Sequence, residues 1–185
     1  LTSVNQYLPF AFAGAAAAAV LVHVMARRSA DAGPARLVLA GVALGASLSS
    51  ITGTMTMYNS KAFDSYRFWV VGSLENRKLE VLLWVAPFLA VGLVLALASA
   101  HSLNALALGD EQATALGVNL AVVRGGAFVA ITLLCGAATA AAGPISFIGL
   151  VIPHVVRLLV GADQRRLLAW SVAAGAGLLL AADVA

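Results

Sequence analysis

The chain has 185 residues, of which 62% are hydrophobic and only 10% are charged, and its formal net charge is +3. A soluble domain has about 25% charged residues, and one of this length could not bury so much apolar surface. The composition therefore excludes an ordinary soluble domain and indicates an integral membrane protein. The small net charge gives no case for nucleic-acid binding. The single cysteine, Cys135, excludes a disulfide framework and a cysteine-based metal site.

Apolar segments with the length or context of membrane spans recur along the chain. The run Gly125–Val156 has no formally charged side chain and is too long for one helix across a core of about 30 Å. Gly143 and Pro144, near its middle, predict a break. The predicted architecture is one all-α domain over residues 1–185, with six spans once this run is divided: Leu8–Ala26, Leu37–Met57, Val81–Ala100, the two halves of Gly125–Val156, and Leu167–Ala182.

Both ends of the sequence look truncated. It begins at Leu1 rather than Met, and it stops directly after an apolar segment. We therefore expect a piece of a larger polytopic protein.

The basic residues predict the orientation. When the spans alternate, Arg27, Arg28, Arg36, Arg124, Arg157, Arg165 and Arg166 fall on one side, and Lys61, Arg67, Arg77 and Lys78 fall on the other. Cytoplasmic loops carry the excess of Lys and Arg, and short loops count most. The first side, which includes the short loop Arg27–Arg36, is therefore predicted to be cytoplasmic.

The external segment Tyr58–Glu80 carries Tyr66, Phe68 and Trp69 among mixed charges. Aromatic residues of this kind sit at the headgroup level, so a short helix along the membrane surface is one interpretation and a solvated loop is the other.

The second span carries small residues at four-residue spacing, which places them on one helix face: Gly41, Gly45, Ser49 and Gly53. Such a face allows two helix backbones to approach closely. Thr52 and Thr56 lie near it, and with Ser49 they offer hydroxyls that line a wet path. Alternatively, the hydroxyls bond to carbonyls of their own helix.

The predicted internal segment, residues 101–124, contains signals for two short helices. Leu103, Leu106 and Ala107 recur at helical spacing up to Gly109, and a second helix fits Asp110–Leu116, with acidic residues at its start and Gly117 as its stop. Two short helices at the cytoplasmic face form a docking surface. The alternative is a connector packed on the surface.

The segment Gly143–Arg157 places Pro144, Pro153, His154 and Arg157 in or near the membrane. Ionisable residues there are functional candidates, although Arg157 can snorkel to the interface. His154 has no metal-ligating partner at a suitable spacing, and Ser146 with His154 forms no nucleophile motif. We therefore expect no catalytic residue, no metal site and no cofactor.

At these residues the chain resembles the membrane permeases of type II ABC importers for iron–siderophore complexes, haem and vitamin B12. The resemblance runs in order over essentially the whole chain: LVLAGVALGA from Leu37, FWVVGSL from Phe68, LNALALGDEQATALGVN from Leu103, AGPISFIGLVIPHVVRLLVGADQRRLL from Ala142, and GAGLLLAADVA from Gly175.

The resemblance implies a ten-helix permease of the bacterial plasma membrane, of which this chain covers about helices four to nine, working as a dimer with a second permease subunit. It implies an ATP-binding subunit at the cytoplasmic face, which hydrolyses ATP, and an external substrate-binding protein. It assigns ATPase coupling to the internal loop through Leu103, Leu106, Gly109, Asp110, Glu111, Ala113, Leu116 and Gly117. It also favours a path-lining role for the second span, and Arg67, Arg77 and Lys78 are candidates for contact with the binding protein.

A ferric siderophore is the expected cargo. Cobalamin or haem is the alternative for the same machinery, because no residue here separates them. A membrane scaffold or ion-conducting subunit without ATP coupling is the alternative of a different class.

Overall fold

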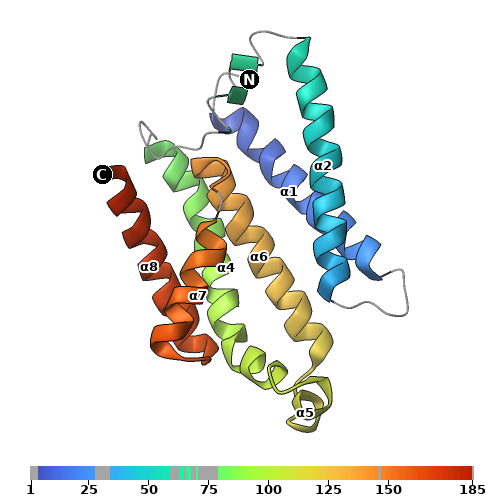
Figure 1. Ribbon diagram of the computed structural model, residues 1–185, viewed down its shortest axis with the longest axis vertical. Coiled ribbons are helices and arrows are strands. Elements are labelled where there is room, and N and C mark those ends of the chain that lie inside the picture. The colour runs from blue at the N-terminus through green and yellow to red at the C-terminus, as the bar shows by residue number, and fades with distance from the viewer. Residues whose placement is uncertain are drawn as a thin grey trace. The chain divides into compact units, whose positions relative to one another are not determined.

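The computed structural model describes residues 4–27, 34–58, 63–64, 66–67, 70, 79–145 and 147–184. Helices and the turns between them account for this part of the chain, and it holds no β-strand. The helices are α1 (Val4–Arg27), α2 (Pro34–Met57), α4 (Leu79–Leu106), α5 (Asp110–Ala115), α6 (Leu120–Ala142), α7 (Ile148–Val160) and α8 (Gln164–Val184) (Figure 1). The predicted external helix within Tyr58–Glu80 lies for the most part outside the described residues.

Four helices are long and apolar enough to cross a membrane: Ala35–Met57, Leu79–Leu106, Leu120–Ala142 and Gln164–Ala182. The other two predicted spans correspond to shorter apolar helices, Phe10–Met25 and Ile148–Val160. The helix α7 has 13 residues and is therefore about 20 Å long, less than a hydrocarbon core of about 30 Å. The helix α1 as a whole, Val4–Arg27, has 24 residues and is long enough to span, so α7 is the one of the six predicted spans that is shorter than the hydrocarbon core.

The predicted break in the long apolar run is confirmed. The helix α6 ends at Ala142, and Gly143 follows with a φ of 81°, a conformation that favours glycine. Because proline has no backbone N–H and disfavours a helical residue before it, Pro144 cannot continue the helix. The next helix begins only at Ile148.

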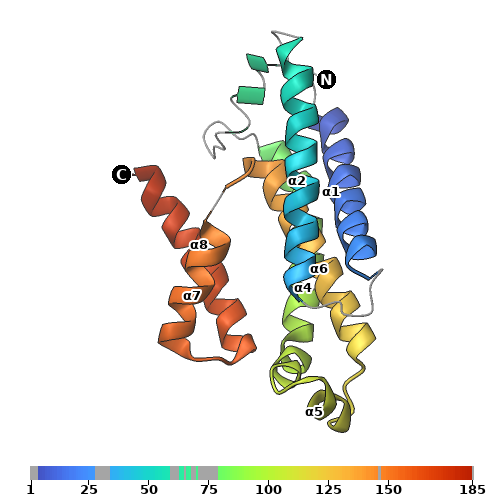
Figure 2. The ribbon, with the colours of Figure 1, turned by 45° about the vertical axis from the view of Figure 1, so that its right-hand side comes forward.

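The chain forms two compact units, which are described separately. The first contains residues 1–85 and 136–144, hence α1, α2 and the adjoining ends of α4 and α6. In it α1 and α2 pack side by side (Figure 2). The end of α6 lies against α1, where Gly136 faces Phe12 and Ala15. Its buried apolar side chains are mostly small: Ala40, Val81, Val85, Ala137, Ala140 and Ala142.

The second unit contains residues 86–135 and 145–185, hence most of α4 and α6 together with α5, α7 and α8. The helices α4 and α6 approach closely at Gly92, where an added Cβ would lie 2.9 Å from Cγ of Leu134. The helices α7 and α8 pack against each other as a hairpin (Figures 1 and 2). Ala100, Ala130, Ile152 and Val156 are buried here.

Large apolar side chains cover the outside of these helices. Leu158 and Leu159 of α7 are each 79% exposed, and the apolar window of α8 has none of its residues buried. A soluble protein does not expose apolar surface on this scale. The exterior therefore fits lipid or other membrane subunits, as the composition indicated.

Candidate functional site

The segment between α4 and α6 is built around two glycine turns. Gly109 has a φ of 106° and a ψ of 159°, a region almost restricted to glycine, and it precedes the six-residue helix α5. Gly117, with a φ of 81°, follows α5, and its N–H donates to Thr114 while the N–H of Val118 donates to Ala113. This pair of bonds is a Schellman motif, which satisfies the carbonyls at the end of a helix. The glycines therefore fix both ends of α5.

One of the two short helices predicted here is not separate. The α4 helix continues without interruption through His101 and Leu103 to Leu106, so those residues form its last turns. The sequence reasoning ended the span at Ala100 because hydropathy falls there, but a helix does not need an apolar sequence to continue. The second predicted helix, from Asp110, is confirmed as α5, which ends at Ala115.

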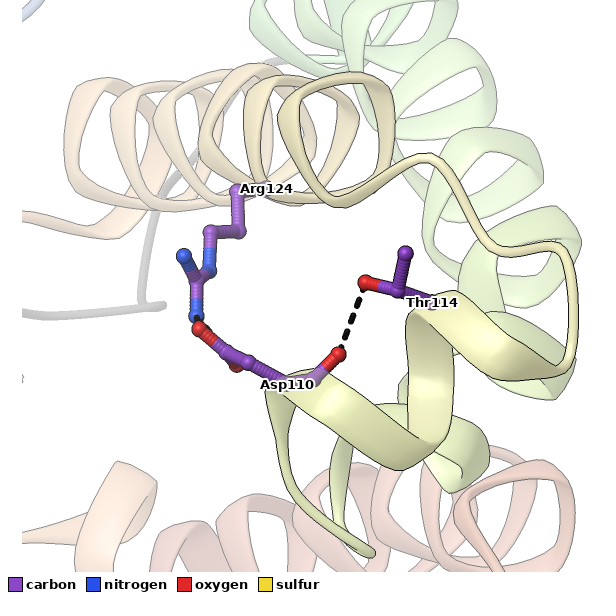
Figure 3. A network of polar contacts seen from close by, with 3 residues as sticks. All are labelled: Asp110, Thr114 and Arg124. Carbon is purple, nitrogen blue, oxygen red and sulfur yellow. Dashed lines mark hydrogen bonds and ion pairs between the residues drawn. The ribbon is translucent and has the colours of Figure 1, made fainter.

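One ion pair joins α5 to α6, and a hydrogen bond within α5 accompanies it. Nη2 of Arg124 lies 2.7 Å from both carboxylate oxygens of Asp110, and the Thr114 hydroxyl donates to the carbonyl of Asp110 (Figure 3). Asn119 caps α6, because its Oδ1 accepts from the N–H groups of Ala121 and Val122. These contacts hold the loop to the start of the next long helix.

The loop presents an exposed outer face. Ala113 is the fully buried residue of α5, whereas Asp110 and Glu111 are exposed and Leu108 and Leu116 are exposed by 62% and 65%. Leu103 and Leu106 are half-buried on α4. Apolar and acidic side chains therefore share one exposed surface around a short, well-fixed helix.

A second polar cluster, which sequence reasoning missed, joins the end of α4 to the turn between α7 and α8. Nδ2 of Asn104 donates to Oδ1 of Asp163 at 2.8 Å, and the N–H of Gln164 donates to Oδ1 of Asn104 at 2.8 Å. Asp163 is also the N-cap of α8, since the same oxygen accepts from the N–H of Arg165 at 3.1 Å. We call Asn104, Asp163 and Gln164 the α4–α8 clamp.

The clamp affects the acidity of its carboxyl group. The hydrogen bond from Asn104, and after it the one from the backbone of Arg165, hold the pKa of Asp163 below its ordinary value of 3.8. Arg166 contributes little, because it is exposed and its Nε lies 4.0 Å from Oδ2. An Asp before a helix was a recognisable capping signal in the sequence, but nothing there pointed to a partner about sixty positions earlier.

The two threonine hydroxyls of the predicted polar face of α2 are satisfied within the helix. Thr52 donates to the carbonyl of Leu48 and Thr56 to that of Gly53, as the alternative interpretation proposed. Close packing of the small residues is not seen within the described part of the chain. A Cβ added at Gly41, Gly45 or Gly53 meets no described atom within 4 Å, and Ser49 and Gly45 are exposed.

The predicted segment Gly143–Arg157 begins before α7 and ends within it. Pro153 is inside the helix, and Phe147, just before it, has a φ of 70° that is rare for a residue other than glycine. His154 and Arg157 are exposed, and they line a shallow hollow of about 250 Å³ together with Pro153, Gln164 and Leu167. Among the described residues, no group of three or more His, Cys, Asp or Glu could hold a metal ion.

The comparisons identify the family. The model of the FecCD transport family matches residues 1–185. This chain belongs to the FecCD transport family. It is 44% identical to the ferric enterobactin transport system permease protein FepD of Escherichia coli (strain K12), over 99% of this chain and 55% of FepD. It is 43% identical to the vitamin B12 import system permease protein BtuC of Yersinia enterocolitica, over 94% of this chain and 52% of BtuC.

A solved structure supports the fold. A metal-chelate type ABC transporter in an inward-facing conformation matches 88% of this chain and 52% of its own, with a TM-score of 0.79 and 29% identity. The chain thus spans about half the length of the relatives it matches. The expected all-helical ABC permease bundle is confirmed, and this FecCD protein is a multi-pass protein of the plasma membrane.

Proposed function

We propose that the chain is part of the permease subunit of an ATP-driven importer that moves a ferric siderophore across the bacterial plasma membrane. The observation that carries the proposal is the family match over residues 1–185, together with 44% identity to a ferric enterobactin permease. The described helices supply the membrane bundle, and the α4–α6 loop supplies an ordered element outside it.

The coupling element in this proposal is the loop centred on α5. Its glycine turns and its ion pair to Arg124 fix its shape, while Glu111, Leu108 and Leu116 remain exposed for a partner. A fixed element transmits a push better than a flexible one, because the push is not absorbed by local bending. The ATP-binding subunit docks here and hydrolyses ATP. The permease sequence itself has no Walker motif.

Transport follows from the movement of this docked element. When ATP draws two nucleotide-binding subunits together, α5 moves with the subunit it contacts, and the attached ends of α4 and α6 move with α5. The spans then rock between outward-facing and inward-facing states. A second permease subunit, as a homodimer, completes the pathway, and an external substrate-binding protein delivers the chelate.

The helix α2 is the proposed path-lining element. Its small face at Gly45, Ser49 and Gly53 is open within the described chain, so it is available to the path or to the second subunit. The threonine hydroxyls near this face already have partners within α2. Arg67 remains a candidate for contact with the binding protein, and Arg77 and Lys78 lie outside the described residues.

The test is uptake of radioactive iron from a panel of ferric siderophores, in cells with and without the full-length gene. We expect deletion to abolish uptake of at least one chelate and the wild-type gene to restore it. Glu111→Lys should fail to restore it while the protein still accumulates in the membrane. Arg36→Glu, which reverses an exposed charge near the start of α2 on the same predicted side, is the control and should restore uptake.

Cobalamin is the second candidate cargo, favoured by 43% identity to a vitamin B12 permease, and haem belongs to the same alternative. Unchanged iron uptake on deletion, with loss of cobalamin or haem uptake, would establish it. Uptake that proceeds without ATP, or that Glu111→Lys leaves unchanged, would instead favour a scaffold or an ion-conducting subunit without ATP coupling.

A further inference from the structure

The α4–α8 clamp joins two segments that the chain itself does not connect closely. Asn104 lies in the last turn of α4, directly before the turn into α5, and Asp163 and Gln164 lie where α7 gives way to α8. The hydrogen bonds run in both directions, because the Asn104 amide donates to the carboxylate and accepts from the backbone N–H of Gln164. Both bonds are 2.8 Å long and partly buried.

The clamp also completes the start of α8. The first N–H groups of a helix have no partner within it. Asp163 satisfies the N–H of Arg165 from within its own segment, whereas the N–H of Gln164 is satisfied by Asn104 from α4. One cap of α8 is therefore supplied by another helix, so separating the two helix ends would exchange this bond for one to water.

The position of the clamp allows it to transmit movement of α5 to other helices. The helix α5 is attached to α6 through Asp110 and Arg124, and it is attached to α4 through the tight turn at residues 107–109. A displacement of α5 thus reaches α6 by one route and the end of α4 by another. The clamp is the described polar contact that carries the second route onward to the α7–α8 turn.

We infer that the α4–α8 clamp makes the α7–α8 hairpin move with the coupling helix α5, and that Asn104 and Asp163 are positioning residues for ATP-driven transport. The inference rests on the proposed function. The amide and carboxylate suit this task, since a hydrogen bond to a charged acceptor is stronger than a neutral one. The lowered pKa of Asp163 agrees, because its first cause is the hydrogen bond that Asn104 donates to the charged carboxylate.

A pair of substitutions tests the clamp through its chemistry. Asn104→Asp places a second carboxylate against Asp163 and removes the amide donor. Asp163→Asn alone is milder, because an amide oxygen can still accept from Asn104 and from the N–H of Arg165. In the double variant the new amide at position 163 donates to the new carboxylate at position 104, which still accepts from Gln164. The double variant should therefore repair the damage of Asn104→Asp.

A matched control comes from the same loop. Asn119→Asp makes the identical chemical change, but Asn119 caps α6 through its own side-chain oxygen, and Asp caps a helix equally well. We expect this variant to behave as the wild type.

The measurements use the full-length gene product assembled with its ATP-binding subunit. The first is hydrogen–deuterium exchange of residues 161–166 with and without that subunit, which requires no cargo. We expect the subunit to slow this exchange in the wild type, Asn104→Asp to lose the effect, and the double variant to regain it. The second is the number of chelates transported for each ATP hydrolysed, which should fall about tenfold in Asn104→Asp, a typical coupling strength.

The outcomes separate the two proposals. If the wild type transports no ferric chelate, the proposed cargo is wrong, and the exchange experiment still decides the clamp. Exchange that does not respond to the ATP-binding subunit in the wild type overturns the inference, as does a double variant no better than Asn104→Asp. If Asn104→Asp fails to accumulate, Asn104→Ala replaces it; lower abundance with an unchanged transport-to-ATP ratio would make the clamp merely structural and overturn the inference.

Discussion

Asp163 performs two tasks with one carboxylate. It caps α8 through the backbone of Arg165, and it receives the side chain of Asn104 from α4. The residue is not buried, so the energy of these bonds is shared with water. Their value lies in geometry, because each bond restricts where the start of α8 can sit.

The lowered pKa of Asp163 predicts how this contribution depends on pH. A carboxyl group whose pKa is lower in the folded state stabilises the fold above its unfolded pKa of about 3.9, and the contribution is lost as the pH falls through the folded pKa. The difference in melting temperature between the wild type and Asp163→Asn should therefore be constant from about pH 5 to pH 8 and shrink below about pH 4. Thermal unfolding across this range checks it, and a difference that changes near neutrality would assign the effect to another group.

The roles of some residues could be predicted from the sequence, and the roles of others could not. Gly143 and Pro144 predicted the end of α6, because a helix break depends on the residues at the break itself. The capping roles of Asn119 and Asp163 also depend on local sequence, so they could have been predicted, but they were not. The partnership of Asn104 with Asp163 was not available, since it depends on how three helices fold back and no short-range pattern records it.

At the scale of elements, α5 owes its definition to the glycines at its ends. Any residue with a Cβ would be strained in the backbone conformation of Gly109 or Gly117. The long helices need no such device, because tens of apolar residues in a membrane form a helix without help.

Substitution of these glycines should therefore destabilise the loop in a graded way. Gly109→Ala should cost about 1–3 kcal/mol, because its backbone region is almost restricted to glycine. Gly117→Ala should cost about 1–2 kcal/mol for a left-handed conformation. Gly125→Ala is the control, since Gly125 lies inside α6 with open space around it, and it should be neutral or slightly stabilising. Thermal unfolding in detergent, followed by tryptophan fluorescence, gives the order; equal effects at all three positions would contradict this explanation.

Helix boundaries were predicted less well than helix existence. Each predicted span corresponds to a helix, because apolar length is a strong signal. The end of α4 was placed too early, since the sequence loses its apolar character at His101 while the hydrogen-bonded helix continues to Leu106. The second half of the long apolar run was expected to span, yet the irregular residues before Ile148 and the turn at Gly161 leave α7 only 13 residues.

At the scale of the whole molecule, the basic residues remain the basis for orientation. They predict that α5 and the α7–α8 turn face the cytoplasm, and that the end of α2 faces outward. The roles of the coupling loop and of the clamp depend on this orientation, because an ATP-binding subunit is cytoplasmic.

Cysteine labelling can test the orientation directly. In a full-length background from which Cys135 and any other cysteine have been removed, Gln112→Cys on α5 should react with a membrane-impermeant thiol reagent in inverted vesicles and not in intact spheroplasts. Tyr58→Cys, at a position 89% exposed after α2, should show the opposite pattern. The same side for both positions, or the two patterns exchanged, would contradict the charge-based orientation.

The short helix α7 carries a consequence for the bilayer around it. An apolar helix of about 20 Å is mismatched with a hydrocarbon layer of about 30 Å, and the remaining depth falls to irregular backbone such as that around Phe147. Peptide groups outside a helix do not tolerate contact with acyl chains, so at that depth they lie against protein or beside water. Where neither protein nor water covers that segment, the bilayer must thin around α7, so we expect bilayer thickness to affect the stability of this part of the protein.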